Sequence, residues 1–193
     1  MSKSAPQNIF NSARALVFFT ALALTQSACG VLLGNVKPVD EKSEAYGIMD
    51  ISKVKPDWVK LQAPNNTKAD SENTVTEIPD AAYQSKATAS IISINSACRP
   101  GDTQERDLRK LTDLLFLGIS NITLREEVAT TVEGAPALQT TLRGSLNNEE
   151  MMLRTIVFRR NQCLYDLVYM ARPDQFPNQE TDFSQFVASL RLK

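Results

Sequence analysis

Four segments with strand character follow one another between residues 122 and 171, and this run constrains the fold more than any other part of the sequence. They are ITLREEV, ALQTTLRGS, MMLRTIVFRR and CLYDLVYMA, at 122–128, 137–145, 151–160 and 163–171. Only Asn161 and Gln162 join the last two, which predicts a β-hairpin. Both alternating faces of CLYDLVYMA are largely apolar, so we expect this strand to lie centrally in a sheet that is covered on both sides.

Two further strands and a helix are predicted ahead of this run. The segments WVKL at 58–61 and ATASIISINS at 87–96 alternate apolar with polar or small residues, which is typical of strands. After a turn, Asp102 and Glu105 have the spacing of a helix capping box. Leucines at helical spacing then predict an amphipathic helix that ends at Gly118.

A second helix is predicted at the end of the chain. Either Thr181 or Asp182 can cap its start, because both side chains accept hydrogen bonds from free backbone amides. The apolar residues of its predicted buried face are Phe183, Phe186, Val187 and Leu190. The expected fold class is therefore α+β, with two helices covering a curved antiparallel sheet.

The order of these elements resembles the PsbP-like fold. The resemblance covers Trp58 to Lys193, and its local part is the ending in which CLYDLVYMARPDQF precedes the helix FSQFVASLRL. This fold is found in the extrinsic protein of photosystem II, in a Ran-binding nuclear import factor and in bacterial lipoproteins of the DcrB and LpqN type. The resemblance implies a layered sandwich of sheet and helices, and it carries no functional residue over to this chain.

The first thirty residues contain a targeting pattern. Residues 1–14 hold two basic residues and no acid, and Ala15–Leu24 is a run of ten residues of low polarity. That run is too short to span a bilayer, which needs roughly 20 residues. A basic flank, a short apolar run and then small residues indicate a secretory signal. The alternative is a buried helix of the folded domain.

The sequence TQSACG at 25–30 resembles the lipobox of bacterial lipoproteins, in which small residues precede a cysteine that is lipidated and becomes the new N-terminus. The resemblance implies that the signal peptide 1–28 is removed and that Cys29 carries acyl chains such as palmitate. Several chains hold a protein firmly in the membrane, at ~0.8 kcal/mol per buried CH₂. Gly30 stands where an Asp would retain the protein in the inner membrane, which implies the outer membrane and a domain facing the periplasm.

The match to the lipobox is incomplete, and the segment after Cys29 has no regular pattern. Gln26 departs from the aliphatic residue usual in the lipobox, so cleavage near Ser27 and a soluble periplasmic protein stay as the alternative. Residues 29–57 mix charge with proline without a steady period, which predicts a flexible tether ahead of a domain at 58–193.

Three cysteines are an odd number for an exported protein. Lipidation of Cys29 accounts for one, which leaves Cys98 and Cys163 as an even pair in an oxidising compartment. We therefore predict a disulfide between these two residues, with Cα atoms roughly 4.4–6.8 Å apart. In the chain-entropy model, closing a loop of about 65 residues contributes ~4 kcal/mol to stability.

The composition excludes several kinds of chemistry. The chain has no histidine, which removes Ser-His-Asp and Cys-His catalytic sites and most zinc sites. Its 21 basic and 22 acidic residues do not give the basic character of a nucleic-acid-binding domain. We expect a non-enzymatic protein that needs no cofactor or metal.

Asp166 is the first candidate binding residue. It lies mid-strand, where burying an unpaired carboxylate would be costly. The hairpin register places it opposite Val157, with Arg159 as a diagonal neighbour on the same face. An ion pair with Arg159 or with Arg143 is the structural explanation, and a binding-site acid on the concave face of the sheet is the functional one.

Phe176 is the second candidate, in the segment 172–183 with its two prolines. This segment either presents a partner-binding loop or caps the sheet with Phe176 tucked against it. Tyr165 and Tyr169 fall on the opposite strand face from Asp166, where we expect core positions with satisfied hydroxyls.

Two functions fit these features. The first is an envelope lipoprotein whose domain binds a protein or assists envelope assembly. The alternative is a periplasmic carrier of a small molecule or lipid, which requires an apolar pocket of ~300 Å³ or more. A hydrolase would need a second carboxylate beside Asp166 or a Ser-Lys dyad.

Overall fold

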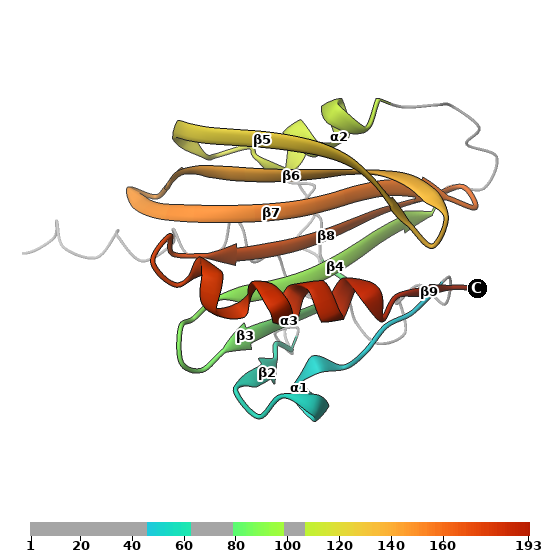
Figure 1. Cartoon of the computed structure of the whole chain (residues 1–193), viewed down its shortest axis with the longest axis horizontal. Helices are drawn as coiled ribbons and strands as arrows, with labels where there is room; N and C mark the ends of the chain where they lie inside the picture. Colours follow the sequence, from blue (N-terminus) through green and yellow to red (C-terminus); the bar gives the residue numbers. More distant parts are fainter. Residues whose placement is uncertain (1–45, 63–78, 99–106) are drawn as a thin grey trace, which may run out of the picture. The chain divides into compact units, whose positions relative to one another are not determined.

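The computed structural model describes residues 46–62, 79–98 and 107–193, all of which belong to the unit formed by residues 33–193. The described part has the expected α+β class, with a seven-stranded antiparallel sheet in the order β2-β3-β4-β8-β7-β6-β5 (Figure 1). A two-stranded β1–β9 pair and three helices complete it. The elements are β1 (Tyr46–Gly47), α1 (Ile51–Val54), β2 (Trp58–Lys60), β3 (Ala81–Ser85), β4 (Ile91–Cys98), α2 (Leu108–Leu115), β5 (Ser120–Val132), β6 (Ala135–Leu146), β7 (Glu149–Arg160), β8 (Cys163–Ala171), α3 (Phe176–Ala188) and β9 (Arg191–Leu192).

The strands from β5 to β8 form a meander joined by three two-residue turns. Both residues of every turn have positive φ, as in type I′ hairpins: Glu133 and Gly134, Asn147 and Asn148, Asn161 and Gln162. Type I′ turns match the twist of the flanking strands, so these short connections fix the register. The predicted hairpin at Asn161 and Gln162 is confirmed, with Val157 opposite Asp166.

The central position of β8 is confirmed, because it is the fourth of the seven strands. Tyr165, Leu167 and Tyr169 point to the face that α3 covers, and all three are buried. Their neighbours on the opposite face, such as Asp166 and Met170, are also buried.

Helix α3 begins earlier than the sequence predicted. Its first residue is Phe176, so the assignment of Thr181 or Asp182 as its cap is wrong. Pro177 explains the difference, since proline suits a first helical turn, where its missing N–H would have no partner anyway. Asp182 lies inside the helix and accepts a hydrogen bond from the Trp58 indole at 2.8 Å.

The predicted buried face of this helix is present. Phe183 and Phe186 are buried against the sheet, and Leu190 is buried just beyond the helix. Val187 is half-buried and packs against the same core.

Residues 46–57 were assigned to the tether, and this assignment is wrong. They form β1 and α1, and Ile51 of α1 has no exposed surface. Asp50 caps α1 by accepting the Ser52 amide. Elements of two to four residues have no detectable period, and only packing against the rest of the domain stabilises them. The domain therefore extends to the N-terminal side of residue 58.

Two other expectations on the N-terminal half need correction. Strand β3 was not predicted, because AAYQS buries residues on both faces and lacks alternation. The predicted strand 87–96 begins only at Ile91, after a turn in which Ala89 has φ of 58°.

Helix α2 is present, and its cap is Asp107. The cap predicted at Asp102 lies outside the described residues.

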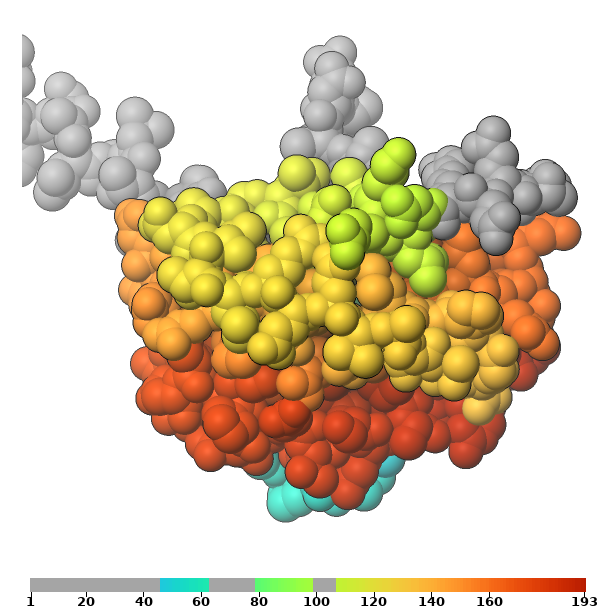
Figure 2. Space-filling model, turned by 45° about the horizontal axis from the view of Figure 1, so that its top comes forward, coloured from blue at the N-terminus to red at the C-terminus, as the bar shows by residue number. Residues whose placement is uncertain are grey.

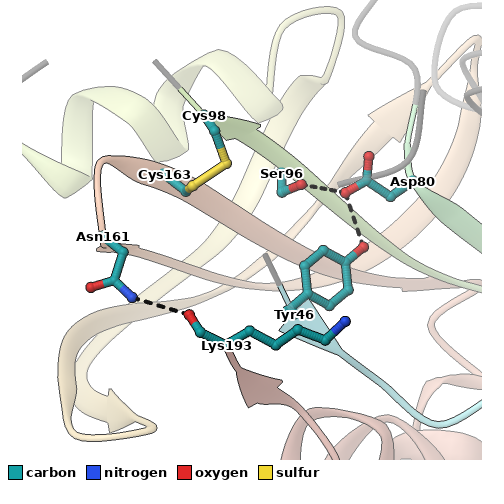
Figure 3. Close-up of a disulfide and its surroundings, with 7 residues drawn as sticks. All are labelled: Tyr46, Asp80, Ser96, Cys98, Asn161, Cys163 and Lys193. Carbon is teal, nitrogen blue, oxygen red and sulfur yellow. Dashed lines mark hydrogen bonds between the residues drawn. A yellow bond between two sulfur atoms is a disulfide. The ribbon is translucent and has the colours of Figure 1, made fainter. Parts of the chain in front are cut away.

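The predicted disulfide between Cys98 and Cys163 is present (Figure 3). It joins the end of β4 to the start of β8, where the two residues are direct partners in the register. Their Cα atoms are 4.0 Å apart, slightly below the expected range. The reason is that directly opposite residues of an antiparallel pair already lie close together.

The signal peptide, Cys29 and the rest of the segment before Tyr46 lie outside the described residues. Within the described ranges, no helix is long and apolar enough to cross a membrane.

Candidate functional site

The candidate site is a surface made by α2, the turn after it and β5, which we call the α2–β5 surface. Three large apolar side chains on it are exposed by about half or more: Leu114 (60%), Leu117 (68%) and Ile122 (49%). Val128 (54%) is exposed as well, but it lies on the opposite face of β5 from Arg125 and Glu127, which contact α2. The other exposed large apolar side chains in the described part of the chain are Val54 (59%) and Val59 (37%). Figure 2 shows α2 in green beside β5 in yellow on one face of the molecule.

Helix α2 packs on β6 and β7, and this packing leaves Leu114 and Leu117 exposed to solvent. The buried side chains of this region are Thr112, whose hydroxyl donates to the Leu108 carbonyl at 2.8 Å, and Phe116. Leu114 and Leu117 point away from the sheet, and Gly118, with φ of 90°, then turns the chain toward β5. The helix and the turn after it therefore present Leu114 and Leu117 to solvent, on the side opposite the packing face of the helix.

Gly144 of β6 allows Ile119 and Ser120, at the start of β5, to lie close to the β6 backbone. A Cβ at this position would lie 2.6 Å from Cγ2 of Ile119 and 2.8 Å from the carbonyl oxygen of Ser120. Only glycine allows this approach without a backbone shift, because the carbonyl oxygen cannot rotate away as a side chain can. The first residue of β5 is thereby held directly over β6.

Four charged side chains form the floor of the surface between α2 and β5. Arg125 donates to Asp113 at 2.6 Å and to Glu127 at 2.8 Å, and Arg109 of α2 also pairs with Glu127. The hydrogen bond to Asp113 is the main reason that the pKa of Arg125 lies above its ordinary value. The Arg125 guanidinium also lies over the Phe116 ring, 5.6 Å from its centre.

These four side chains line a hollow of about 640 Å³. Its lining is charged, and it does not provide the apolar pocket that a lipid carrier requires. Within the described residues, no group of three or more His, Cys, Asp or Glu side chains is arranged to hold a metal ion.

Asp166, the first sequence candidate, is buried on the face of the sheet opposite α3. Its carboxylate accepts a hydrogen bond from the Asn95 amide at 3.2 Å. The pairing with Arg143 is wrong, because the register places that side chain on the other face, where it contacts Glu150 at 3.0 Å. Arg159 does share the face of Asp166, as predicted. Neither side chain is among those that line the charged hollow.

Phe176, the second candidate, is buried rather than presented to a partner. Its ring lies 4.7 Å from that of Tyr169, whose hydroxyl donates to the Phe176 carbonyl at 2.7 Å. Burial raises the pKa of Tyr169 to about 12. The capping interpretation of this segment is confirmed, and so is the core position of Tyr169.

A buried polar network next to the disulfide was not predicted. Asp80 accepts hydrogen bonds from the Tyr46 hydroxyl at 2.9 Å and from the Ser96 hydroxyl (Figure 3). Burial is the main cause that raises the pKa of Tyr46, and the Asp80 charge adds to it. The network ties the β1 segment to β4, so its role in the fold is structural.

The residues of the α2–β5 surface were also missed, although the sequence holds a signal for some of them. Leu114 and Leu117 fall outside the leucine face that predicts α2, so they are apolar residues on the polar side of an amphipathic helix. Ile122 carries no such signal, because a strand can bury either face.

Comparisons with known proteins bear on the fold. No family model and no curated protein matches this sequence. Among solved structures, the chain is similar to cyanobacterial PsbP (CyanoP) from Synechocystis sp. PCC 6803, with a TM-score of 0.53 and 11% identity over 88% of this chain and 98% of CyanoP. This likeness confirms the expected PsbP-like fold.

Two further solved structures show weaker likeness. One is LpqN, involved in cell envelope biogenesis of Mycobacterium tuberculosis, with a TM-score of 0.47 and 13% identity over 77% of this chain and 83% of that one. The other is PA94 from Pseudomonas aeruginosa, a protein of unknown function, with a TM-score of 0.46 and 14% identity over 70% of this chain and 81% of that one.

Proposed function

We propose that this chain is a lipid-anchored protein of the bacterial envelope whose PsbP-like domain binds another protein through the α2–β5 surface. The observation that carries the proposal is the exposure of Leu114, Leu117 and Ile122 beside the charged side chains between α2 and β5. Scattered apolar residues are normal on a protein surface, whereas a contiguous group rimmed by polar residues is typical of an interaction site.

The charged floor of the surface favours binding over catalysis. Both acids are held by arginines, since Asp113 contacts Arg125 and Glu127 contacts Arg125 and Arg109. Such groups present a fixed pattern of charge at an interface, which contributes to partner choice more than to affinity. We therefore propose a non-enzymatic role, in binding or in assembly of the envelope.

The proposed location rests on the lipobox-like sequence around Cys29. Acyl chains on this cysteine would hold the domain at the outer membrane, facing the periplasm, and the chain between Cys29 and Tyr46 would separate the domain from the lipid. A partner within the envelope can then bind the α2–β5 surface while the domain stays anchored to the membrane.

Replacing Cys29 with serine should abolish lipid attachment. Serine has no thiol to acylate, so radiolabelled fatty acid should no longer enter the protein, and the chain should be unprocessed or leave the membrane fraction. Gln26→Leu restores the usual lipobox residue and should be processed at least as fast. Equal labelling of wild type and Cys29→Ser would contradict the anchoring.

A photoreactive amino acid at Leu117 should crosslink the partner in intact envelopes. Leu117 is the most exposed of the three apolar residues, so a docked partner must lie against it. We expect one discrete adduct, reduced at least tenfold by Leu114→Lys, because a charge buried in an apolar contact costs several kcal/mol.

Val54 is the matched control, since it is 59% exposed on α1, which lies outside the surface. The same photoreactive residue there should give no adduct of that mass. Equal adducts at Leu117 and Val54, or none at Leu117, would refute binding through the α2–β5 surface.

A further inference from the structure

We propose that the regular part of β5, residues 124–132, pairs antiparallel with the same residues of a second copy of this chain. Two seven-stranded sheets would then join along this edge. The inference goes beyond the proposed function, because it assigns an occupant to the outer edge of β5, and it leaves Leu114 and Leu117 for another protein.

The first argument is that β5 is a long edge strand. It is last in the strand order, and its only partner among the described strands is β6. It has 13 residues, against three in β2 at the other edge. All of its residues except Leu124, Glu127 and Val132 are exposed. A strand of this kind presents a row of unpaired amides and carbonyls, which is a template for pairing with another strand.

The second argument is the length of its regular part. The pairing with β6 shifts register between Ser120 and Leu124 and is then continuous from Leu124 to Val132. Val128 is the middle residue of this stretch. A two-fold axis through Val128 therefore pairs the whole regular part with its copy, and no other register does so.

The third argument is that the apolar residues match in this register. Val128 lies opposite its own copy, and Leu124 lies opposite Val132 at both ends. Residues that pair in this way are an even number apart, so their side chains lie on the same face of the joined sheet. Cross-strand pairs of β-branched and other apolar residues stabilise a sheet by roughly 0.2–1 kcal/mol each. Val128, 54% exposed in a single copy, would be covered.

The fourth argument is that no two charged residues of β5 lie directly opposite each other in this register. Each lies opposite a neutral residue: Arg125 opposite Thr131, Glu126 opposite Thr130, and Glu127 opposite Ala129. A two-fold axis through Arg125, Glu126 or Glu127 would instead place like charges directly opposite each other, which is destabilising. The pairs of Arg125 with Asp113 and Glu127 are made within one chain and are kept in the dimer.

A cysteine at Val128 tests both the pairing and the register. Directly opposite residues have Cα atoms about 4.5–5.5 Å apart, within reach of a disulfide. Val128→Cys in the full chain should therefore give most of the protein as a covalent dimer in intact envelopes. Ala129→Cys should give several-fold less, because its copies are offset by two residues along the strand. Val54→Cys, at a valine of similar exposure, should give none.

Opposite charges at the axis give a second, non-covalent test. Val128→Lys and Val128→Glu should each sediment as monomers in the full chain carrying Cys29→Ser, because like charges meet at the axis. An equimolar mixture should recover the dimer, since lysine then faces glutamate. Val54→Lys should stay dimeric. Val128 is exposed in a single copy, so both variants should stay folded and unfold cooperatively as monomers.

The inference is overturned if wild type sediments as a monomer at every concentration, or if Val128→Cys dimerises no more than Val54→Cys. If either result occurs while Leu117 still crosslinks its partner, the proposed function stands and the second copy is not the occupant. If Val128→Cys dimerises and Leu117 gives no adduct, the self-pairing stands and the binding of another protein fails.

Discussion

Replacing Phe186 with alanine should lower the free energy of unfolding by about 3–5 kcal/mol. Its side chain has no exposed surface and packs between α3 and the sheet, with its ring edge-on to Tyr83 at 5.8 Å. Truncation removes this apolar contact and leaves a cavity that the rigid sheet cannot close. A loss of that size is a large share of the 5–15 kcal/mol that typically separates folded from unfolded protein.

Denaturant unfolding of the disulfide-intact protein measures this loss. Gln185→Ala is the matched control, because the neighbouring Gln185 is exposed and its truncation should change stability by less than about 0.5 kcal/mol. A loss below about 1 kcal/mol for Phe186→Ala would mean that the helix face is not packed on the sheet.

Reducing the bond between Cys98 and Cys163 should lower stability by ~4 kcal/mol. The two cysteines are 65 residues apart, and in the chain-entropy model their bond limits the freedom of the unfolded chain. Native pairing should persist, because Cys98 and Cys163 are only the last of eight partner pairs between β4 and β8. The reduced protein should stay folded at 25 °C and melt roughly 10 °C lower.

Thermal unfolding with and without reductant checks this prediction. The double variant Cys98→Ser/Cys163→Ser should match the reduced wild type and should not respond to reductant. Protein taken from the envelope should have neither thiol free when it is alkylated without reductant. Two free thiols, or equal melting temperatures in both conditions, would contradict a stabilising disulfide.

Much of the fold could be predicted from short-range patterns in the sequence. The turn at Asn161 and Gln162 predicts its hairpin because a two-residue loop with positive φ fixes the register of its strands. The apolar content of CLYDLVYMA places β8 in the centre of the sheet, and the spacing of Phe183 and Phe186 gives the buried face of α3. The signal for each of these lies within about ten residues of the chain, so it can be recognised before the fold is known.

Other features depended on partners far away in the chain. Residues 46–57 were read as a tether because α1 and β1 are too short to show a period, and contacts with distant parts of the domain hold them in place. Asn95, 71 positions away from Asp166, donates a hydrogen bond to its carboxylate, and no hairpin register predicts this contact. The sequence suggests that Phe176, beside Pro177, is exposed. The structure shows that it is buried, with its ring packed on that of Tyr169.

The sequence by itself determined the signal-like N-terminus, the α+β class, the cysteine pair and the lack of histidine chemistry, since these follow from residue types and short-range spacing. Only the tertiary structure decided which apolar residues remain exposed. Ile122 and Val128 resemble core residues of a strand, and they are exposed because β5 is last in the strand order. That position is set by long-range pairing of the whole sheet, and the candidate binding surface follows from it.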